Sequence, residues 1–211
     1  MDLDARHLIR DTAELSALYG APRERSVRKQ IDHLDEHCRA FIAASPLLII
    51  GTQAPGPDGV ADTSPRGGDP GFVKVADDHT LLIPDHRGNN RLDTIHNLIR
   101  NPRAGILFVV PGVAYTLRVN GEGVISREPR LIEIFETRGS LPRTVLVVTV
   151  KEAYVHCSRA LVRADAWNPE KFVAAGAIPS FGTIMAAHTC GFVDGKAVDE
   201  ENVAHLPQTL Y

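Results

Sequence analysis

Residues 82–92 read LIPDHRGNNRL and join three kinds of local structure in one short stretch. The apolar residues that end at Ile83 are typical of a strand. Pro84 and Asp85 are expected to stop that strand, because Pro cannot donate to a β-ladder and Asp favours turns. Residues from about 92 to 100 then show the apolar spacing of a helix. The sequence therefore predicts a strand, a turn and a helix start in direct succession.

The turn within this stretch is rich in groups that bind anions. Arg87 and Arg91 supply two positive charges, with Gly88, Asn89 and Asn90 between them. The start of the following helix would add unpaired backbone N–H groups and the positive end of the helix dipole. The turn is therefore a candidate phosphate site. The same residue types are common in ordinary surface turns, and the turn by itself leaves that alternative open.

The rest of the chain reads as short strands that are joined mainly by hairpin turns, the first of them at residues 54–59. The predicted strands cover residues 47–53, 60–64, 71–76, 80–83, 104–110, 114–126 and 144–156. Most connections are too short for the helical crossover that parallel neighbours need. We therefore predict a mainly β fold, an antiparallel β-barrel of about six or seven strands with peripheral helices.

A helix is expected to precede the first strand. Ser26 can cap it, and Ile31, Leu34 and Phe41 recur at helical spacing with charged residues between them. Pro46 is expected to end it, because the residue before a proline avoids the α region.

The chain length of 211 residues fits one domain with extensions. We expect an N-terminal extension over residues 1–25 and a barrel domain over residues 26–176. Residues 177–211 are expected to form a C-terminal extension that packs on the barrel or on a dimer.

Composition excludes several classes of protein. Apolar residues make up 44% of the chain, so the chain is globular. The net charge is −3 and no basic run stands out, so no nucleic-acid partner is expected. No apolar run approaches the roughly 20 residues that span a bilayer, and the polar N-terminus is unlike a signal peptide. We predict a cytoplasmic protein that does not contact a membrane.

Cysteine and histidine placement argues against metal and disulfide chemistry. Cys38, Cys157 and Cys190 are odd in number, far apart and outside any C-x-x-C motif, as expected in a reducing compartment. His33 and His37 have helical i,i+4 spacing, which alone is a weak signal, and no metal site is predicted. The chain also lacks the G-x-S-x-G, Walker and G-x-G-x-x-G motifs.

Three further positions are candidates for ligand binding. The run Ser64–Gly68, SPRGG, is expected as a second Arg/Gly turn that antiparallel pairing could bring beside the first. Arg118 alternates with apolar residues on a predicted strand, where an arginine is more often an ion-pair partner or extends to water. Trp167 precedes a predicted helix start and could cover an aromatic ligand, although such a residue more often packs in a core or an interface.

The order of these motifs resembles a known family. The motifs SPRGG, GFV, LLIPDHRGNNRLDTIHN, TLRVNGEG and HCSRALVRADAW follow one another between residues 64 and 167, and the likeness as a whole runs from about residue 35 to residue 167. In that order they are similar to the pyridoxamine 5'-phosphate oxidase-like family, and most closely to a bacterial branch with a P-D-x-x-G-N-N-R signature. The resemblance implies a split β-barrel and a homodimer that binds flavin mononucleotide (FMN) at the subunit interface.

The resemblance also implies roles for individual residues. Ser64, Pro65, Arg66 and Gly67 would lie along the flavin ring and ribityl chain, with Arg66 near the pyrimidine side, and Pro84 and Asp85 would line the ring or ribityl chain. The FMN phosphate would be held by Arg87, Asn89, Asn90 and Arg91, with Gly88 allowing close backbone approach. Arg118 and Trp167 would reach the flavin from the partner subunit. The implied function is a flavin-dependent oxidoreductase that acts on a small molecule.

Two departures disfavour vitamin B6 as the substrate. True pyridoxamine phosphate oxidases carry an arginine-containing C-terminal segment, whereas residues 190–211 of this chain contain no arginine. Their phosphate turn carries an Arg-Lys pair where this chain has Asn89 and Asn90. Three alternatives stay open: an FMN carrier without turnover, a haem-binding protein with His156 or His188 as axial ligand, and a deazaflavin-dependent reductase.

Overall fold

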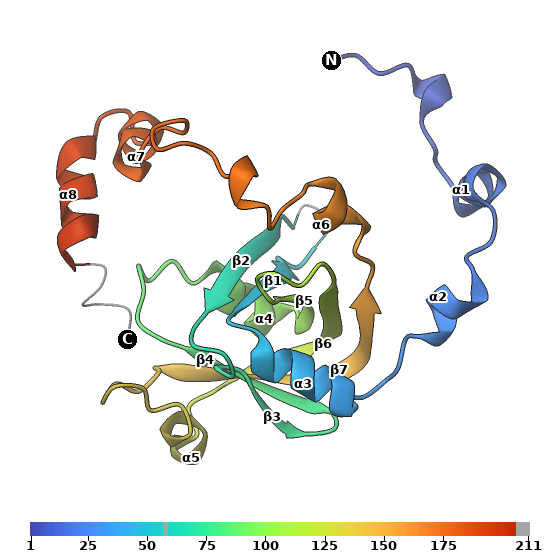
Figure 1. Ribbon diagram of the computed structural model, residues 1–211, viewed down its shortest axis with the longest axis horizontal. Helices are drawn as coiled ribbons and strands as arrows, with labels where there is room; N and C mark the ends of the chain where they lie inside the picture. Colours follow the sequence, from blue (N-terminus) through green and yellow to red (C-terminus); the bar gives the residue numbers. More distant parts are fainter. Residues whose placement is uncertain (57–58, 206–211) are drawn as a thin grey trace.

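The computed structural model describes residues 1–56 and 59–205 as a curled antiparallel sheet surrounded by helices (Figure 1). The strands are β1 (Leu47–Gln53), β2 (Ala61–Gly67), β3 (Lys74–Asp77), β4 (Thr80–Asp85), β5 (Arg103–Val109), β6 (Thr116–Ser126) and β7 (Thr144–His156). Their order in the sheet is β2-β1-β5-β6-β7-β4-β3, and each neighbouring pair is antiparallel. The predicted antiparallel split β-barrel is confirmed. Residues 57–58 of the first predicted turn and residues 206–211 lie outside the described residues.

The barrel is split along one seam. The sheet curls until its edge strand β2 lies near β4, where Arg66 Nε and Asp85 Oδ1 are 3.8 Å apart. Within the described residues no backbone ladder joins β2 to β3 or β4. Side chains therefore close the barrel at this seam.

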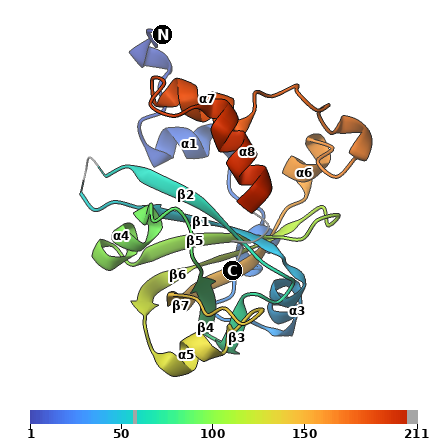
Figure 2. The same ribbon diagram turned by 90° about the vertical axis from the view of Figure 1, so that its left-hand side faces the viewer.

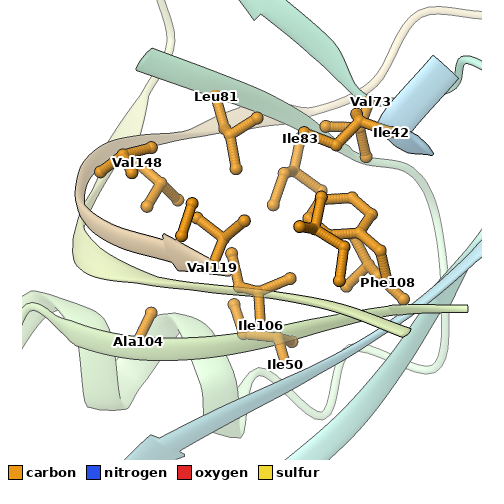
Figure 3. Close-up of a cluster of buried hydrophobic side chains, with 14 of the residues drawn as sticks. Ile42, Ile50, Val73, Leu81, Ile83, Ala104, Ile106, Phe108, Val119 and Val148 are labelled. Carbon is orange, nitrogen blue, oxygen red and sulfur yellow. The ribbon is translucent and has the colours of Figure 1, made fainter. Parts of the chain in front are cut away.

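Alternating side chains of the strands fill the barrel interior (Figure 3). Ile50, Ile106, Phe108, Val119 and Val148 are at most 1% exposed and meet there. Strand β1 shows the alternation plainly, because every second residue is buried. This interior cluster holds the sheet in its curled form and so fixes the distance across the seam.

A glycine makes the closest approach between β6 and β7 possible. The register between these strands shifts at Asn120 and Gly121, which marks a bulge. A Cβ atom on Gly121 would lie 2.2 Å from the backbone oxygen of Thr149. Only glycine fits this bend, which helps to curl the long β6–β7 ribbon.

Helices surround the barrel and form an arm at each end of the described chain. The α-helices are α1 (Thr12–Tyr19), α2 (Glu24–Arg28), α3 (Glu36–Ala44), α4 (Asp93–Arg100), α5 (Pro129–Glu133), α6 (Arg159–Arg163), α7 (Phe181–His188) and α8 (Gly195–His205), and the 3₁₀ helices are η1 (Ala5–His7) and η2 (Pro169–Lys171). Helices α3 and α4 insert Ile42 and Leu98 into the core. Helix α1 and the α7–α8 pair extend beyond the β1–β2 side of the barrel (Figure 2). Among residues 1–56 and 59–205, no helix combines the length and apolar character that crossing a bilayer requires.

Two predicted strand boundaries were wrong. Strand β4 does not stop at Pro84 but continues through Asp85, which pairs with Thr144 of β7. Strand β3 pairs with β4 only as far as Leu82, so Pro84 lies where one side of β4 is already open and a missing N–H costs little. Residues 64–67 likewise belong to the edge strand β2 instead of a turn, and an edge strand tolerates its proline.

The helix predicted from Ser26 is interrupted. Helix α2 ends at Arg28, and Ile31 forms an isolated bridge to Ala153 of β7, with N–O distances of 3.0 and 2.7 Å. Helix α3 starts at Glu36, after the N-cap Asp35, whose Oδ1 accepts from Cys38 N at 2.8 Å. Pairing with β7 and a better N-cap thus override the helical spacing.

Candidate functional site

A cavity of about 630 Å³ lies along the seam of the barrel. Its walls come from the end of β2, the end of β4, the loop that follows β4, the start of α4 and the start of β7. Ten of the predicted site residues line it: Pro65, Arg66, Gly67, Pro84, Asp85, Arg87, Gly88, Asn89, Asn90 and Arg91. The two Arg/Gly segments that are separate in the sequence therefore share one cavity.

The β2–β4 side of the cavity holds a half-buried ion pair. The side chains of Arg66 and Asp85 are 27% and 23% exposed, and Arg66 Nη1 also donates to Pro65 O at 2.9 Å. Burial raises the pKa of the Asp85 carboxyl, and the nearby charges of Arg66, His86 and Arg143 counter part of that rise. This side of the cavity combines a fixed cation with a carboxyl that is costly to ionise.

The opposite side is the turn between β4 and α4. Asn89 Oδ1 accepts from Arg91 N at 3.0 Å, and Asn90 has a φ of 59°, a conformation that asparagine tolerates well. Arg91 Nε contacts Asp93 Oδ2 at 2.5 Å. Helix α4 starts after Leu92 without a side-chain cap, and Leu92 and Ile95 of this helix start line the cavity. The turn thus offers cations and backbone donors together.

Arg143 and Thr144, at the start of β7, also line the cavity, and sequence reasoning missed both. Arg143 Nη1 donates to Asn90 Oδ1 at 3.3 Å. A signal was present in the sequence, because Arg143 directly precedes the long predicted strand 144–156 and Thr144 is its first residue. Nothing in the sequence indicated that this strand would pair with β4.

Three predicted site residues lie outside the cavity of their own chain. Ser64 is on β2 and pairs with Ile50. Arg118 Nη1 donates to the hydroxyl of Tyr154 at 3.0 Å, with the guanidinium 5.5 Å from the ring centroid. Trp167 Nε1 donates to Val113 O at 2.9 Å. Within one chain, the structure does not bring Arg118 or Trp167 to the cavity.

The outer face of the sheet beside Arg118 is apolar. Leu47 pairs with Val109 and Ile49 with Leu107, and these outward side chains are partly exposed. The inward residues of the same strands are buried in the core. The Leu47–Ile49 part of β1 and the Leu107–Val109 part of β5 are therefore apolar on both faces, a pattern that is typical of strands covered on both sides.

The composition of the cavity favours an anionic ligand of moderate size. Four arginines, Arg66, Arg87, Arg91 and Arg143, line it together with the single lining carboxylate, Asp85. The volume falls in the range of roughly 300–1,000 Å³ that is usual for small-molecule sites. Among the described residues, no three histidine, cysteine or acidic side chains are grouped to hold a metal ion. These residues fit a phosphate-bearing ligand.

Comparison with known proteins supplies a family and several structural relatives. Residues 34–157 match the family model described as pyridoxamine 5'-phosphate oxidase. No curated protein sequence matches the chain. Similar crystal structures include HupZ of group A Streptococcus, with 18% identity, a TM-score of 0.47, and coverage of 57% of this chain and 92% of that one.

Two other similar structures come from other bacteria. General stress protein 26 of Bacillus anthracis has 16% identity, a TM-score of 0.39, and coverage of 56% of this chain and 88% of that one. An FAD binding protein of Mycobacterium smegmatis has 18% identity, a TM-score of 0.38, and coverage of 60% of this chain and 98% of that one.

Proposed function

The chain belongs to the pyridoxamine 5'-phosphate oxidase family, and from that premise we propose that it binds FMN and acts as a flavin-dependent oxidoreductase on a small molecule. One observation carries the proposal. The SPRG segment of β2 and the HRGNNR turn after β4 line a single cationic cavity of about 630 Å³. FMN has a phosphate at one end and a planar ring at the other, and each of these two segments offers a surface for one of them.

The turn after β4 would hold the FMN phosphate. Arg87 and Arg91 would supply charge-assisted hydrogen bonds, each contributing about 1.5–3 kcal/mol. Asn89 and Asn90 would supply neutral contacts and fix the turn, and Gly88 would let the backbone approach the phosphate. All five residues line the cavity.

The β2–β4 side would hold the ring and ribityl chain. Pro65, Arg66 and Gly67 would lie along them from β2, and Pro84 and Asp85 from β4. The ion pair of Arg66 with Asp85 supports this role, because it orients the guanidinium toward the shared cavity. Bound flavin would supply the hydride chemistry, so the chain needs no acid–base pair of its own for that step.

We further propose that the functional unit is a homodimer with FMN at the subunit interface. The partly exposed apolar side chains of Leu47, Ile49, Leu107 and Val109 support it, because a second copy would remove them from water. Arg118 and Trp167 would then reach the cavity of the partner subunit. Residues 26–176 would form the flavin-binding unit, and the extensions 1–25 and 177–211 would pack on the dimer.

The absorption spectrum of the purified protein tests the flavin proposal. We expect flavin bands, or their appearance when FMN is added to the apoprotein. Arg87→Ala and Arg91→Ala should each weaken FMN binding about tenfold or more, which corresponds to about 1.4 kcal/mol. Arg130→Ala, an exposed arginine on α5 that does not line the cavity, is the matched control and should leave FMN affinity unchanged.

A colourless protein that ignores FMN would reject the proposal. A Soret band on haem titration would favour the haem alternative, and tighter binding of a deazaflavin than of FMN would favour the reductase alternative. Stoichiometric FMN without oxidase or reductase turnover would leave a carrier.

A further inference from the structure

The start of β7 brings a hydroxyl and a guanidinium to the cavity from a segment to which the family resemblance gives no role. Thr144 pairs with Asp85 in the β4–β7 ladder, and Arg143 N donates to Asp85 O at 3.0 Å. Paired residues of an antiparallel ladder project their side chains to the same face of the sheet. Thr144 therefore faces the side of the cavity that holds Asp85 and Arg66.

The Thr144 hydroxyl is a buried group without a hydrogen-bond partner among the described residues. Burying a hydroxyl without a partner costs free energy, so buried polar atoms are nearly always paired. Because Thr144 lines the cavity, a polar atom of a ligand is the natural partner. A hydroxyl both donates and accepts, which suits uncharged groups such as a polyol hydroxyl or a ring carbonyl.

Arg143 serves the other side of the cavity. Its Nη1 donates to the side chain of Asn90, at the middle of the phosphate turn, over 3.3 Å. The guanidinium has five N–H donors in a rigid plane, so this one bond leaves donors for an anion. The contact also ties the turn to β7, and so holds the cation beside the residues that would bind phosphate.

We infer that Arg143 and Thr144 are ligand-binding residues of this cavity: Arg143 is a third cation of the phosphate site, and Thr144 hydrogen-bonds the uncharged part of the same ligand. The inference rests on the proposed flavin function and assigns each of the two residues to a different part of the ligand. Arg143 strengthens the binding of ligands that carry a phosphate. Thr144 binds the ribityl chain or ring whether or not a phosphate is present.

Titration of the full-length apoprotein with FMN and with riboflavin, which lacks the phosphate, separates the two roles. Arg143→Ala should weaken FMN binding about tenfold or more and leave riboflavin binding within about twofold. Thr144→Val should weaken FMN and riboflavin by the same factor, roughly three- to tenfold. Thr144→Ser keeps the hydroxyl and should bind both flavins as the wild type does.

Two control variants match the chemistry of the test residues. Thr149→Val removes an exposed hydroxyl from the same strand, and Arg130→Ala removes an exposed guanidinium on α5; neither should change either affinity. The inference is overturned if Arg143→Ala weakens FMN and riboflavin equally or not at all, or if Thr144→Val binds both flavins normally. In that result Arg87→Ala would still lose FMN and the proposed function would stand. A wild-type protein that binds neither flavin overturns both.

Discussion

At the scale of single residues, Asp85 shows how the cavity sets its own electrostatics. Its carboxyl is largely buried, and burial disfavours the charged form more strongly than Arg66, His86 and Arg143 favour it. A carboxyl in this state costs stability when it ionises. The cationic lining therefore has a structural use even before a ligand binds, because it lowers that cost.

The raised pKa of Asp85 predicts a pH dependence of stability with a definite sign. The folded state holds the Asp85 proton more tightly than the unfolded state does, because the pKa of Asp85 is raised above its ordinary value of 3.8 in the folded protein. The contribution of Asp85 to the free energy of unfolding therefore falls as pH rises from 3.8 through the raised pKa. Asp85→Asn should remove this decrease in the free energy of unfolding, because asparagine does not ionise. Urea denaturation of the cofactor-free wild type and variant between about pH 4 and about pH 7 measures it.

The difference between the two proteins isolates Asp85, because the other carboxylates contribute equally to both curves. We expect the free energy of unfolding of the variant to increase relative to that of the wild type as pH rises. Parallel curves would show that Arg66 and its neighbours fully compensate the burial of Asp85.

At the scale of elements, the α7–α8 hairpin is a small unit that holds itself together. Gly182 is the sole buried residue in the described part of these two helices, and a Cβ on it would lie 1.9 Å from Gly195 O. Asp199 of α8 accepts from Gly182 N at 2.7 Å and from Ser180 Oγ at 2.5 Å, which caps α7. The exposed apolar side chains of Phe181 and Phe192 give the hairpin an apolar surface that the described residues leave open to solvent.

Gly182→Ala should separate α7 from α8 without unfolding the barrel. The added methyl group cannot fit at the helix crossing, and the hairpin buries no side chain that the barrel core uses. Hydrogen exchange should rise over residues 180–205 and stay unchanged in β5–β7. Ala197→Ser adds one atom on the exposed face of α8 and is the control. Increased exchange throughout the barrel would contradict this independence.

At the scale of the whole molecule, the barrel leaves a row of outward apolar side chains partly exposed. Strands β1 and β5 present apolar side chains outward as well as inward, and both helical arms extend beyond the β1–β2 side of the barrel (Figure 2). A second copy placed on this face would cover the outward residues.

Ile49→Glu should convert the proposed dimer to a monomer. A charge at the centre of the outward apolar row would have to be desolvated at the interface, which is strongly unfavourable. Analytical ultracentrifugation should give twice the chain mass of 23.0 kDa for the wild type and the single chain mass for the variant. The monomer should also lose FMN affinity, because the site would be incomplete.

Ile99→Glu places the same charge on an exposed apolar residue of α4 and should leave the mass unchanged. A wild type that sediments at the mass of one chain would reject the dimer.

The sequence by itself determined what depends on neighbours along the chain. An apolar run bounded by turn residues located β1, and a long β-branched run located β7, both residue for residue; the Arg/Gly/Asn composition of residues 87–91 marked a candidate anion-binding turn. The antiparallel character followed from the shortness of the connections. These properties are local, so a single sequence carries them.

Only the tertiary structure decided what depends on strand pairing. The β4–β7 ladder carries Arg143 and Thr144 to the cavity, the curl of the sheet brings Arg66 within 3.8 Å of Asp85, and open strand edges let Pro65 and Pro84 stay in β-structure. The bridge from Ile31 to Ala153 likewise divides a helix that local spacing favours. Pairing between distant segments is fixed by how the whole core closes, and local preference yields to it.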